Sequence, residues 1–170
     1  MFLLPVESER LLFRPYTDDD FDFLMSLLTD PEMVRFIGNG ETRNIYGGKN
    51  FLSWIYSTYK FGDNLGLLLL VRKEDNVLIG HAGLVPQVIE NEVEIEIGYW
   101  IARDYWGQGY ATEAAIALWK YGKEHLNKQR FIALIQPENV VSQKVAKNIG
   151  MVMEKKIILG GKSVNVFSIS

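Results

Sequence analysis

The chain has 170 residues, of which 48% are hydrophobic and 23% charged, so it is long enough for a single globular domain over residues 1–170 with its own core. Its formal net charge of −3 argues against nucleic acid as a partner, because phosphate backbones bind to basic surfaces. The absence of cysteine excludes disulfides, thiolate metal sites and a cysteine nucleophile, and no apolar run reaches the length of a membrane span.

The N-terminal part of the chain predicts one short strand followed by helices. Residues 1–5 lack the basic region of a secretory signal, so a cytoplasmic protein without a membrane partner is expected. Thr17 is suited to cap a helix whose first turn holds the aspartates of residues 18–20, which we interpret as a solvated helix start rather than a metal site. The expected elements are a strand at residues 10–15, a helix from residue 18 to the Asp30-Pro31 pair, a helical turn at 31–36 and a helix at 44–60.

The remainder of the chain alternates between strand and helix patterns. The expected elements are strands at residues 67–72, 77–85 and 93–101, a helix at 111–126, a strand at 131–135, a helix at 140–149, and a hairpin of strands at 153–159 and 163–169. This order predicts an α/β (α+β) protein with one mixed sheet of about six to seven strands and helices on both faces.

The junction between the third of these strands and the next helix carries the clearest functional signal. Gly107 and Gly109 allow backbone angles that other residues avoid, and they let a ligand approach the main chain. A helix that begins at residue 111 directs unpaired N–H groups and a partial positive charge toward this turn, which suits a phosphate. The turn alone is equally compatible with a loop that binds nothing, and its spacing matches neither a dinucleotide fingerprint nor a nucleoside-triphosphate loop.

Two separated motifs resemble the GNAT superfamily of acyl-CoA-dependent N-acetyltransferases, and most of all its branch that acetylates the N-termini of ribosomal proteins. The first runs from Glu96-Ile97-Gly98-Tyr99-Trp100 through Tyr105-Trp106-Gly107-Gln108-Gly109-Tyr110-Ala111-Thr112-Glu113-Ala114. The second runs from Asn139-Val140-Val141-Ser142 to Gly150-Met151, and the opening Ser8-Glu9-Arg10-Leu11-Leu12-Phe13-Arg14 is similar to the first strand of that branch. The resemblance covers nearly the whole chain.

This resemblance implies the GNAT fold and acetyl-CoA as the co-substrate. The residues implied to contact the coenzyme are Tyr99, Ile101, Trp106, Gly107, Gln108, Gly109, Tyr110, Ala111, Thr112, Asn139 and Ser142. Two positions depart from the family pattern. Trp106 stands where the diphosphate loop usually begins with Gln or Arg, and Ala146 stands where many members carry a tyrosine that protonates the departing thiolate.

Acetyl transfer to an amine requires a group that removes the ammonium proton. Glu90, Glu92, Glu94 and Glu96 recur at every second position, which places them on one face of a strand. Glu90 and Glu92 are interpreted as a solvated face, whereas adjacent like charges would raise the pKa of Glu94 and Glu96. Glu96 is the first candidate base, acting through water, and Glu94 the second; a structural or substrate-holding role for Glu96 is the alternative.

The other groups are assigned with more than one alternative. A main-chain N–H between Tyr99 and Ile101 is implied to stabilise the thioester oxygen. Ser142 is the first candidate to contact or protonate the sulfur, with an ordinary helix surface as the rival; Tyr105 and Tyr110 are weaker candidates. Asn139 is either a coenzyme contact or the N-cap of a helix. His81 is interpreted as a packed residue and otherwise as a base, His125 as structural, and Glu113 is expected to point away from the loop.

Together these features predict an acetyl-CoA-dependent N-acetyltransferase without a metal, which transfers acetyl directly in a ternary complex to the N-terminal amine of a protein. An acyl-enzyme through Ser142 is an alternative for the mechanism. Alternatives for the function are a small-molecule amine acetyltransferase, an acyl-CoA-binding module without turnover, and a nucleotide-binding domain. The acidic row would suit a basic acceptor, and a monomer or a homodimer is expected.

Overall fold

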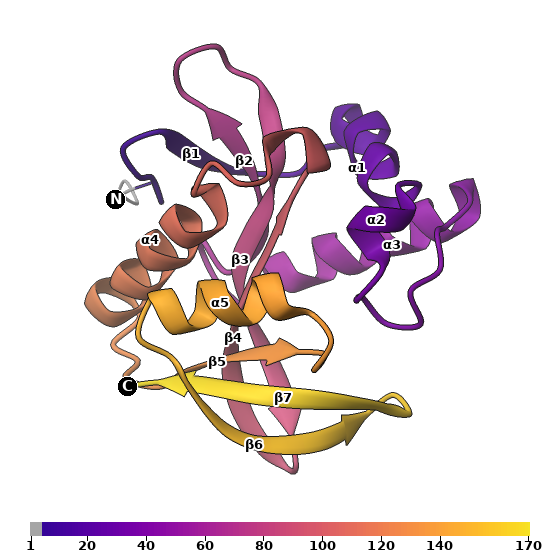
Figure 1. Cartoon of the computed structure of the whole chain (residues 1–170). Coiled ribbons are helices and arrows are strands. Elements are labelled where there is room, and N and C mark those ends of the chain that lie inside the picture. Colours follow the sequence, from indigo (N-terminus) through magenta and orange to yellow (C-terminus); the bar gives the residue numbers. More distant parts are fainter. Residues whose placement is uncertain (1–4) are drawn as a thin grey trace.

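The computed structural model describes residues 5–170, which form one mixed sheet of seven strands in the order β1-β2-β3-β4-β5-β7-β6 (Figure 1). The strands are β1 (Leu11–Pro15), β2 (Gly66–Arg72), β3 (Leu78–Ile89), β4 (Glu92–Ile101), β5 (Phe131–Ile135), β6 (Val152–Leu159) and β7 (Lys162–Ile169). The mixed sheet predicted from the sequence is confirmed. The prediction that no export signal is present rests on residues 1–5, of which residues 1–4 lie outside the described part of the chain.

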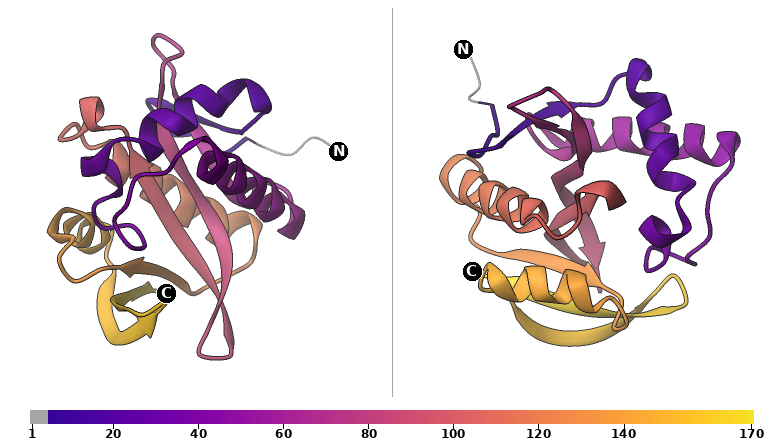
Figure 2. Two further views of the ribbon diagram at one scale, coloured as in Figure 1. Left: turned by 90° about the vertical axis from the view of Figure 1, so that its right-hand side faces the viewer. Right: turned by 45° about the horizontal axis from the view of Figure 1, so that its top comes forward.

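Helices cover both faces of this sheet (Figure 2). The helices are α1 (Phe21–Leu28), α2 (Pro31–Val34), α3 (Ile45–Thr58), α4 (Tyr110–His125) and α5 (Val140–Asn148). Residues of α4 and α5 such as Leu118 and Ala146 share a buried cluster with one sheet face, whereas Leu24 of α1 and Ile55 of α3 pack against the other. None of the described helices combines the length and apolar character needed to cross a membrane.

The sheet divides between β4 and β5, which form its one parallel contact among the described residues. Among the described residues, Glu96 and Ile132 are the one pair of the two strands in register. We call the region beyond that pair, where Gly98–Ile101 of β4 faces β5, the β4–β5 split. Parallel strands are joined by a crossover, and here the crossover is α4, which therefore begins at the same end of β4 as the split.

The hairpin of β3 and β4 is longer than the sequence predicted. β3 continues past Val85 to Ile89 even though it contains Pro86, because Pro86 pairs with Ile95 at a position where the β3 N–H does not face β4. On the other side of β3, β2 begins at Gly66, which pairs with Leu84. No β2 residue therefore lies beside Pro86 to accept the hydrogen bond that a proline cannot donate. The prediction that Glu90 lies on the strand is wrong: it occupies the turn, with φ +49°.

The predicted start of the first helix is also altered. Residues 18–20 form a 3₁₀ turn ahead of α1, and Thr17 donates its N–H to the Asp20 carboxylate at 2.8 Å. The same carboxylate accepts two hydrogen bonds from Arg14, at 2.8 and 2.9 Å, and Asp20 is only 6% exposed. Asp20 is therefore not part of a solvated helix start, because an ion pair allows its burial.

Candidate active site

The turn between β4 and α4 leaves the first helical N–H groups free of side-chain caps. Gly109 is the N-cap residue of α4, with φ +81°, and no side chain caps the helix there. Gly107 also has positive φ, +76°, and a methyl group added to it would meet no atom within 4 Å. The turn is thus open above Gly107, and the N-terminal amides of a four-turn helix face it, which fits the diphosphate of a coenzyme.

Trp106 connects this turn to the end of β4. Its indole N–H donates to the Ile101 carbonyl at 2.6 Å, and the side chain is 46% exposed. The next residue along the strand, Ala102, donates its N–H to the Ile79 carbonyl of β3 at 2.8 Å. Because main-chain groups alternate in direction along a strand, Tyr99 and Ile101 direct theirs away from β3, toward the β4–β5 split.

The other candidate coenzyme contacts lie around the start of α4. Gln108 directs its carbonyl at Arg10 (3.0 Å), whereas Ala111 and Thr112 lie in the first helical turn and are partly buried. Tyr110 is only 4% exposed, so its ring does not offer a surface to a ligand. Thr112 also lines a surface hollow of about 440 Å³ beside α4.

Glu96 lies at the level where β4 and β5 separate. Its carboxylate accepts a hydrogen bond from Gln87 Nε2 at 3.0 Å and another from the main-chain N–H of Leu134 on β5. Burial raises the pKa of Glu96 above its usual range, although these two hydrogen bonds act in the opposite direction. The sequence suggested that a neighbouring negative charge raises this pKa, whereas the structure gives burial as the cause.

The acidic row does not form a continuous negative strip. Glu94 binds Arg130, with an Nη2–Oε2 distance of 2.8 Å, and the turn residue Glu90 binds Lys155 at 2.9 Å. Arg130 also pairs with Glu154 of β6 at 2.7 Å. Glu90 and Glu94 thus already have cationic partners within the chain, and the suitability of this row for a basic acceptor stays a prediction.

Tyr99 and Ser142 meet on the opposite face of β4 from Glu96. The Tyr99 hydroxyl donates to the Ser142 carbonyl at 2.9 Å, and the Ser142 hydroxyl lies 3.2 Å from the same phenol oxygen. Burial raises the pKa of Tyr99 to about 12, with Glu96 adding a smaller effect and Ser142 opposing it. This pair keeps its protons at neutral pH, so it is a pair of potential donors beside the split.

Asn139 is the N-cap of α5, since its side-chain oxygen accepts the Ser142 N–H at 3.1 Å. We expect Asn139→Ala to lower the free energy of unfolding by about 1 kcal/mol in a urea titration, because the cap is lost. Asn139→Asp retains an oxygen cap and removes the amide donor. If Asn139 also binds the coenzyme, Asn139→Asp should weaken coenzyme A binding without loss of stability. If calorimetry gives equal affinities for the variant and the wild type, Asn139 serves only as the N-cap of α5.

His81 is a buried, packed residue. It has no exposed surface, its Nδ1 lies 2.7 Å from the Tyr16 hydroxyl, and its ring is 4.6 Å from that of Trp100. Burial lowers the pKa of His81 to about 3, which makes it a poor base at neutral pH. Tyr105 and Tyr110 contact Arg72 of β2 rather than Ser142, so they do not join the Tyr99 hydroxyl.

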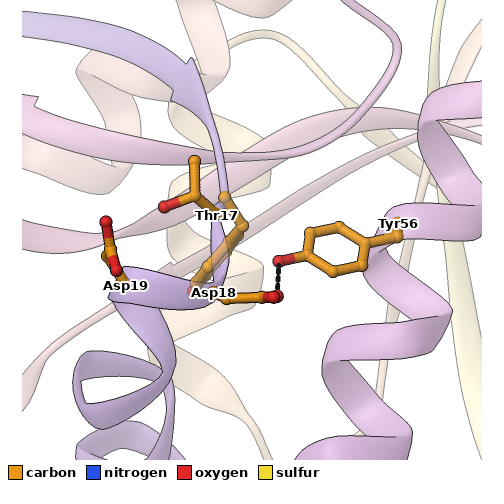
Figure 3. Close-up of a pocket in the computed structure, with 5 residues that line it drawn as sticks. Thr17, Asp18, Asp19 and Tyr56 are labelled. Atoms are coloured by element: carbon orange, nitrogen blue, oxygen red, sulfur yellow. Dashed lines mark hydrogen bonds between the residues drawn. The ribbon is translucent and has the colours of Figure 1, made fainter.

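A second hollow lies away from these groups. It has a volume of about 540 Å³ and is lined by Tyr16, Thr17, Asp18, Asp19 and Tyr56. The Tyr56 hydroxyl donates to the Asp18 carboxylate at 2.6 Å, the hydrogen bond drawn as a dashed line in Figure 3. Most of its lining residues come directly after β1, and β2 and β3 lie between β1 and β4 in the sheet. Among the described residues, no group of three histidine or acidic side chains is arranged to hold a metal ion.

A family model described as acetyltransferase (GNAT) domain matches residues 10–152. The Bacillus subtilis (strain 168) protein YkkB is 35% identical over 162 residues, which cover 94% of this chain and 92% of YkkB. The N-acetyltransferase YnaD of the same organism is 31% identical over 150 residues, covering 86% of this chain and 81% of YnaD.

Solved structures share the same arrangement of elements. A GNAT-family acetyltransferase from Bacillus anthracis has a TM-score of 0.80 and 27% identity, with 98% of each chain covered. RimL, a ribosomal L7/L12 alpha-N-protein acetyltransferase in complex with coenzyme A, has a TM-score of 0.77 and 18% identity, covering 96% of this chain and 95% of RimL. Spermidine N-acetyltransferase from Vibrio cholerae, in complex with CoA and spermine, has a TM-score of 0.73 and 17% identity, covering 94% and 95%. The expected fold is confirmed.

Proposed function

This chain belongs to the GNAT acetyltransferase family, and on that basis we propose that it transfers the acetyl group of acetyl-CoA to the N-terminal α-amine of a protein. Acetyl-CoA, when bound, supplies an acetyl group activated as a thioester. The observation that supports this function most directly is the β4–β5 split, which carries a half-buried carboxylate on one face and a hydroxyl pair on the other.

The main chain around the split would hold the donor. The amides at the start of α4, with the two glycines before them, would bind the diphosphate, since no side chain caps them. The Tyr99 and Ile101 main-chain groups face the split, and an N–H there would donate to the thioester oxygen as charge develops on it. No particular side chain is needed for either contact.

The side chains at the split have separate tasks. Glu96, on the α1 and α3 face, would accept the proton of the incoming ammonium, directly or through water, because only the neutral amine has a lone pair to attack with. Tyr99 and Ser142, on the α4 and α5 face, would give a proton to the departing sulfur. The amine would thus enter from one face of the sheet and the thiol leave on the other.

The pKa values of the candidate amines favour an N-terminal α-amine as the acceptor. An N-terminal amine has a pKa near ~8, whereas alkyl amines such as lysine have pKa values near ~10.4. A carboxylate with a raised pKa, such as Glu96, takes a proton more readily from the weaker base. RimL, which acts on a ribosomal protein N-terminus, has the same fold; a small polyamine, the substrate named for the Vibrio cholerae structure, is the second candidate.

A thermal-shift and turnover experiment tests this function. We expect coenzyme A at 100 times its dissociation constant to stabilise the protein by about 2.7 kcal/mol, while ATP and NAD give no shift. Release of free thiol from acetyl-CoA should then require an amine, and peptides with free N-termini should exceed spermidine, lysine and aminoglycosides in kcat/KM.

Each alternative gives a different result in the same experiment. Stabilisation by coenzyme A without thiol release across the whole panel would indicate a binding module. A preference for spermidine would replace the protein acceptor by a small amine. Stabilisation by ATP or NAD and not by coenzyme A would contradict the proposed function itself.

A further inference from the structure

Arg10, the residue before β1, joins the N-terminal segment to the turn that precedes α4. Its Nη2 donates to the Gln108 carbonyl at 3.0 Å, and its Nε donates to Glu113 Oε1 at 2.7 Å. The guanidinium also lies over the Tyr110 ring, 4.1 Å from its centroid. One side chain therefore contacts the turn, the first residue of α4 and the end of the first helical turn.

The contact with Gln108 fixes the orientation of one peptide group. The Gln108 carbonyl and the Gly109 N–H belong to the same planar trans peptide, so they point in opposite directions. With the carbonyl held against Arg10, the Gly109 N–H faces away from Arg10. This peptide can rotate about the φ angle of Gly109, and glycine resists that rotation less than any other residue would.

Glu113 keeps the Arg10 guanidinium in place. It also accepts hydrogen bonds from the Ser8 hydroxyl at 2.5 Å and from the Arg10 main-chain N–H at 2.9 Å. Burial opposes ionisation of Glu113, but the hydrogen bonds from Ser8 and Arg10 hold its pKa below the usual range. A carboxylate that stays charged near the turn would repel a diphosphate, and the Arg10 cation removes that repulsion.

We propose that Arg10 is a positioning residue for the coenzyme diphosphate, which sets the Gln108–Gly109 peptide so that the Gly109 N–H faces the ligand and neutralises Glu113 beside it. The inference rests on the proposed use of coenzyme A at this turn. It assigns to Arg10 an effect on donor affinity that does not depend on a direct contact between the guanidinium and the coenzyme.

The test compares three variants with the wild-type protein by calorimetric titration of coenzyme A at 25 °C. Arg10→Ala should weaken coenzyme A binding about tenfold, because a charge-assisted hydrogen bond and the preset amide are both lost. Arg10→Lys should give an intermediate affinity, since a single ammonium cannot bind Gln108 and Glu113 as a fork does. Arg14→Ala, which breaks a comparable ion pair with Asp20 near the other end of β1, should leave the affinity unchanged.

A second measurement separates positioning from general destabilisation. The ¹H–¹⁵N resonance of Gly109 should differ between wild type and Arg10→Lys without ligand, and it should respond to coenzyme A more weakly in the variant. An affinity within about twofold of wild type for Arg10→Ala, or for Arg10→Lys if the alanine variant does not fold, would overturn the proposal. An unchanged Gly109 resonance would also overturn it, whereas a wild-type protein that fails to bind coenzyme A would refute the proposed function instead.

Discussion

Replacement of Glu96 by glutamine is expected to lower kcat by about 10²- to 10⁴-fold at pH 7. Glutamine has the shape of glutamate and can still bond to Gln87 and to the Leu134 amide, but it cannot take a proton. Coenzyme A affinity should stay within about twofold, because the proposed diphosphate contacts lie at the turn before α4 rather than at Glu96.

The pH dependence of this variant identifies the role more specifically. Since burial raises the pKa of Glu96, wild-type activity should rise with pH through a value above the usual carboxylate range. The variant should lose that limb, and its deficit should shrink above pH ~8, where an N-terminal amine is already neutral. A pH-independent deficit would instead indicate that Glu96 only holds the substrate.

Two matched substitutions serve as comparisons. Glu92→Gln removes a charge from the same strand at an exposed position and should leave kcat unaltered. Glu94→Gln breaks the pair with Arg130 and should reduce stability more than turnover. If the Glu94 substitution lowered kcat more than the Glu96 substitution, the assignment of the base would be reversed.

Removal of the Tyr99 or Ser142 hydroxyl is expected to lower kcat by about 10²-fold, the contribution typical of a general acid. Because each hydroxyl bonds to the other residue, Tyr99→Phe and Ser142→Ala should be strongly non-additive, with the double variant little worse than either single one. Rates are measured at saturating acetyl-CoA with the amine selected from the panel.

The identity of the leaving group tests this assignment independently. A thioester donor whose thiol is more acidic than that of coenzyme A leaves without a proton, so the Tyr99→Phe and Ser142→Ala deficits should largely disappear with it. Deficits that persist with the acidic donor would show that the two residues support the structure of α5. If kcat were unchanged in all variants, the proton for the departing thiolate would have to come from solvent.

The local parts of this site followed from the sequence, because they depend on short-range geometry. The alternation of apolar residues up to Ile101 predicted β4, and Gly107 with Gly109 predicted the turn in which both have positive φ. Helical spacing after Tyr110 predicted α4. In each case one backbone conformation fits a few neighbouring residues, so no distant contact has to be known.

The partners of the site residues could not be predicted, because they come from other elements. Gln87 reaches Glu96 diagonally across the β3–β4 hairpin, a contact set by the Glu90 turn and by a strand that continues through Pro86. Arg10 reaches Gln108 from 98 residues away, and Arg130, the residue before β5, pairs with Glu94 of β4. Only the hairpin contact had a local signal, in the residues of its turn.

The one-pair contact between β4 and β5 separates the requirements of the two substrates. In the proposed function, donor recognition there would rely on peptide groups, which every amino acid supplies, so replacements of the outward side chains would have little effect on coenzyme use. Acceptor recognition would then come from the side chains of α1, α3 and their connecting loops, where a few replacements alter charge and shape. A protein built in this way can change the amine that it modifies while its acyl source stays constant.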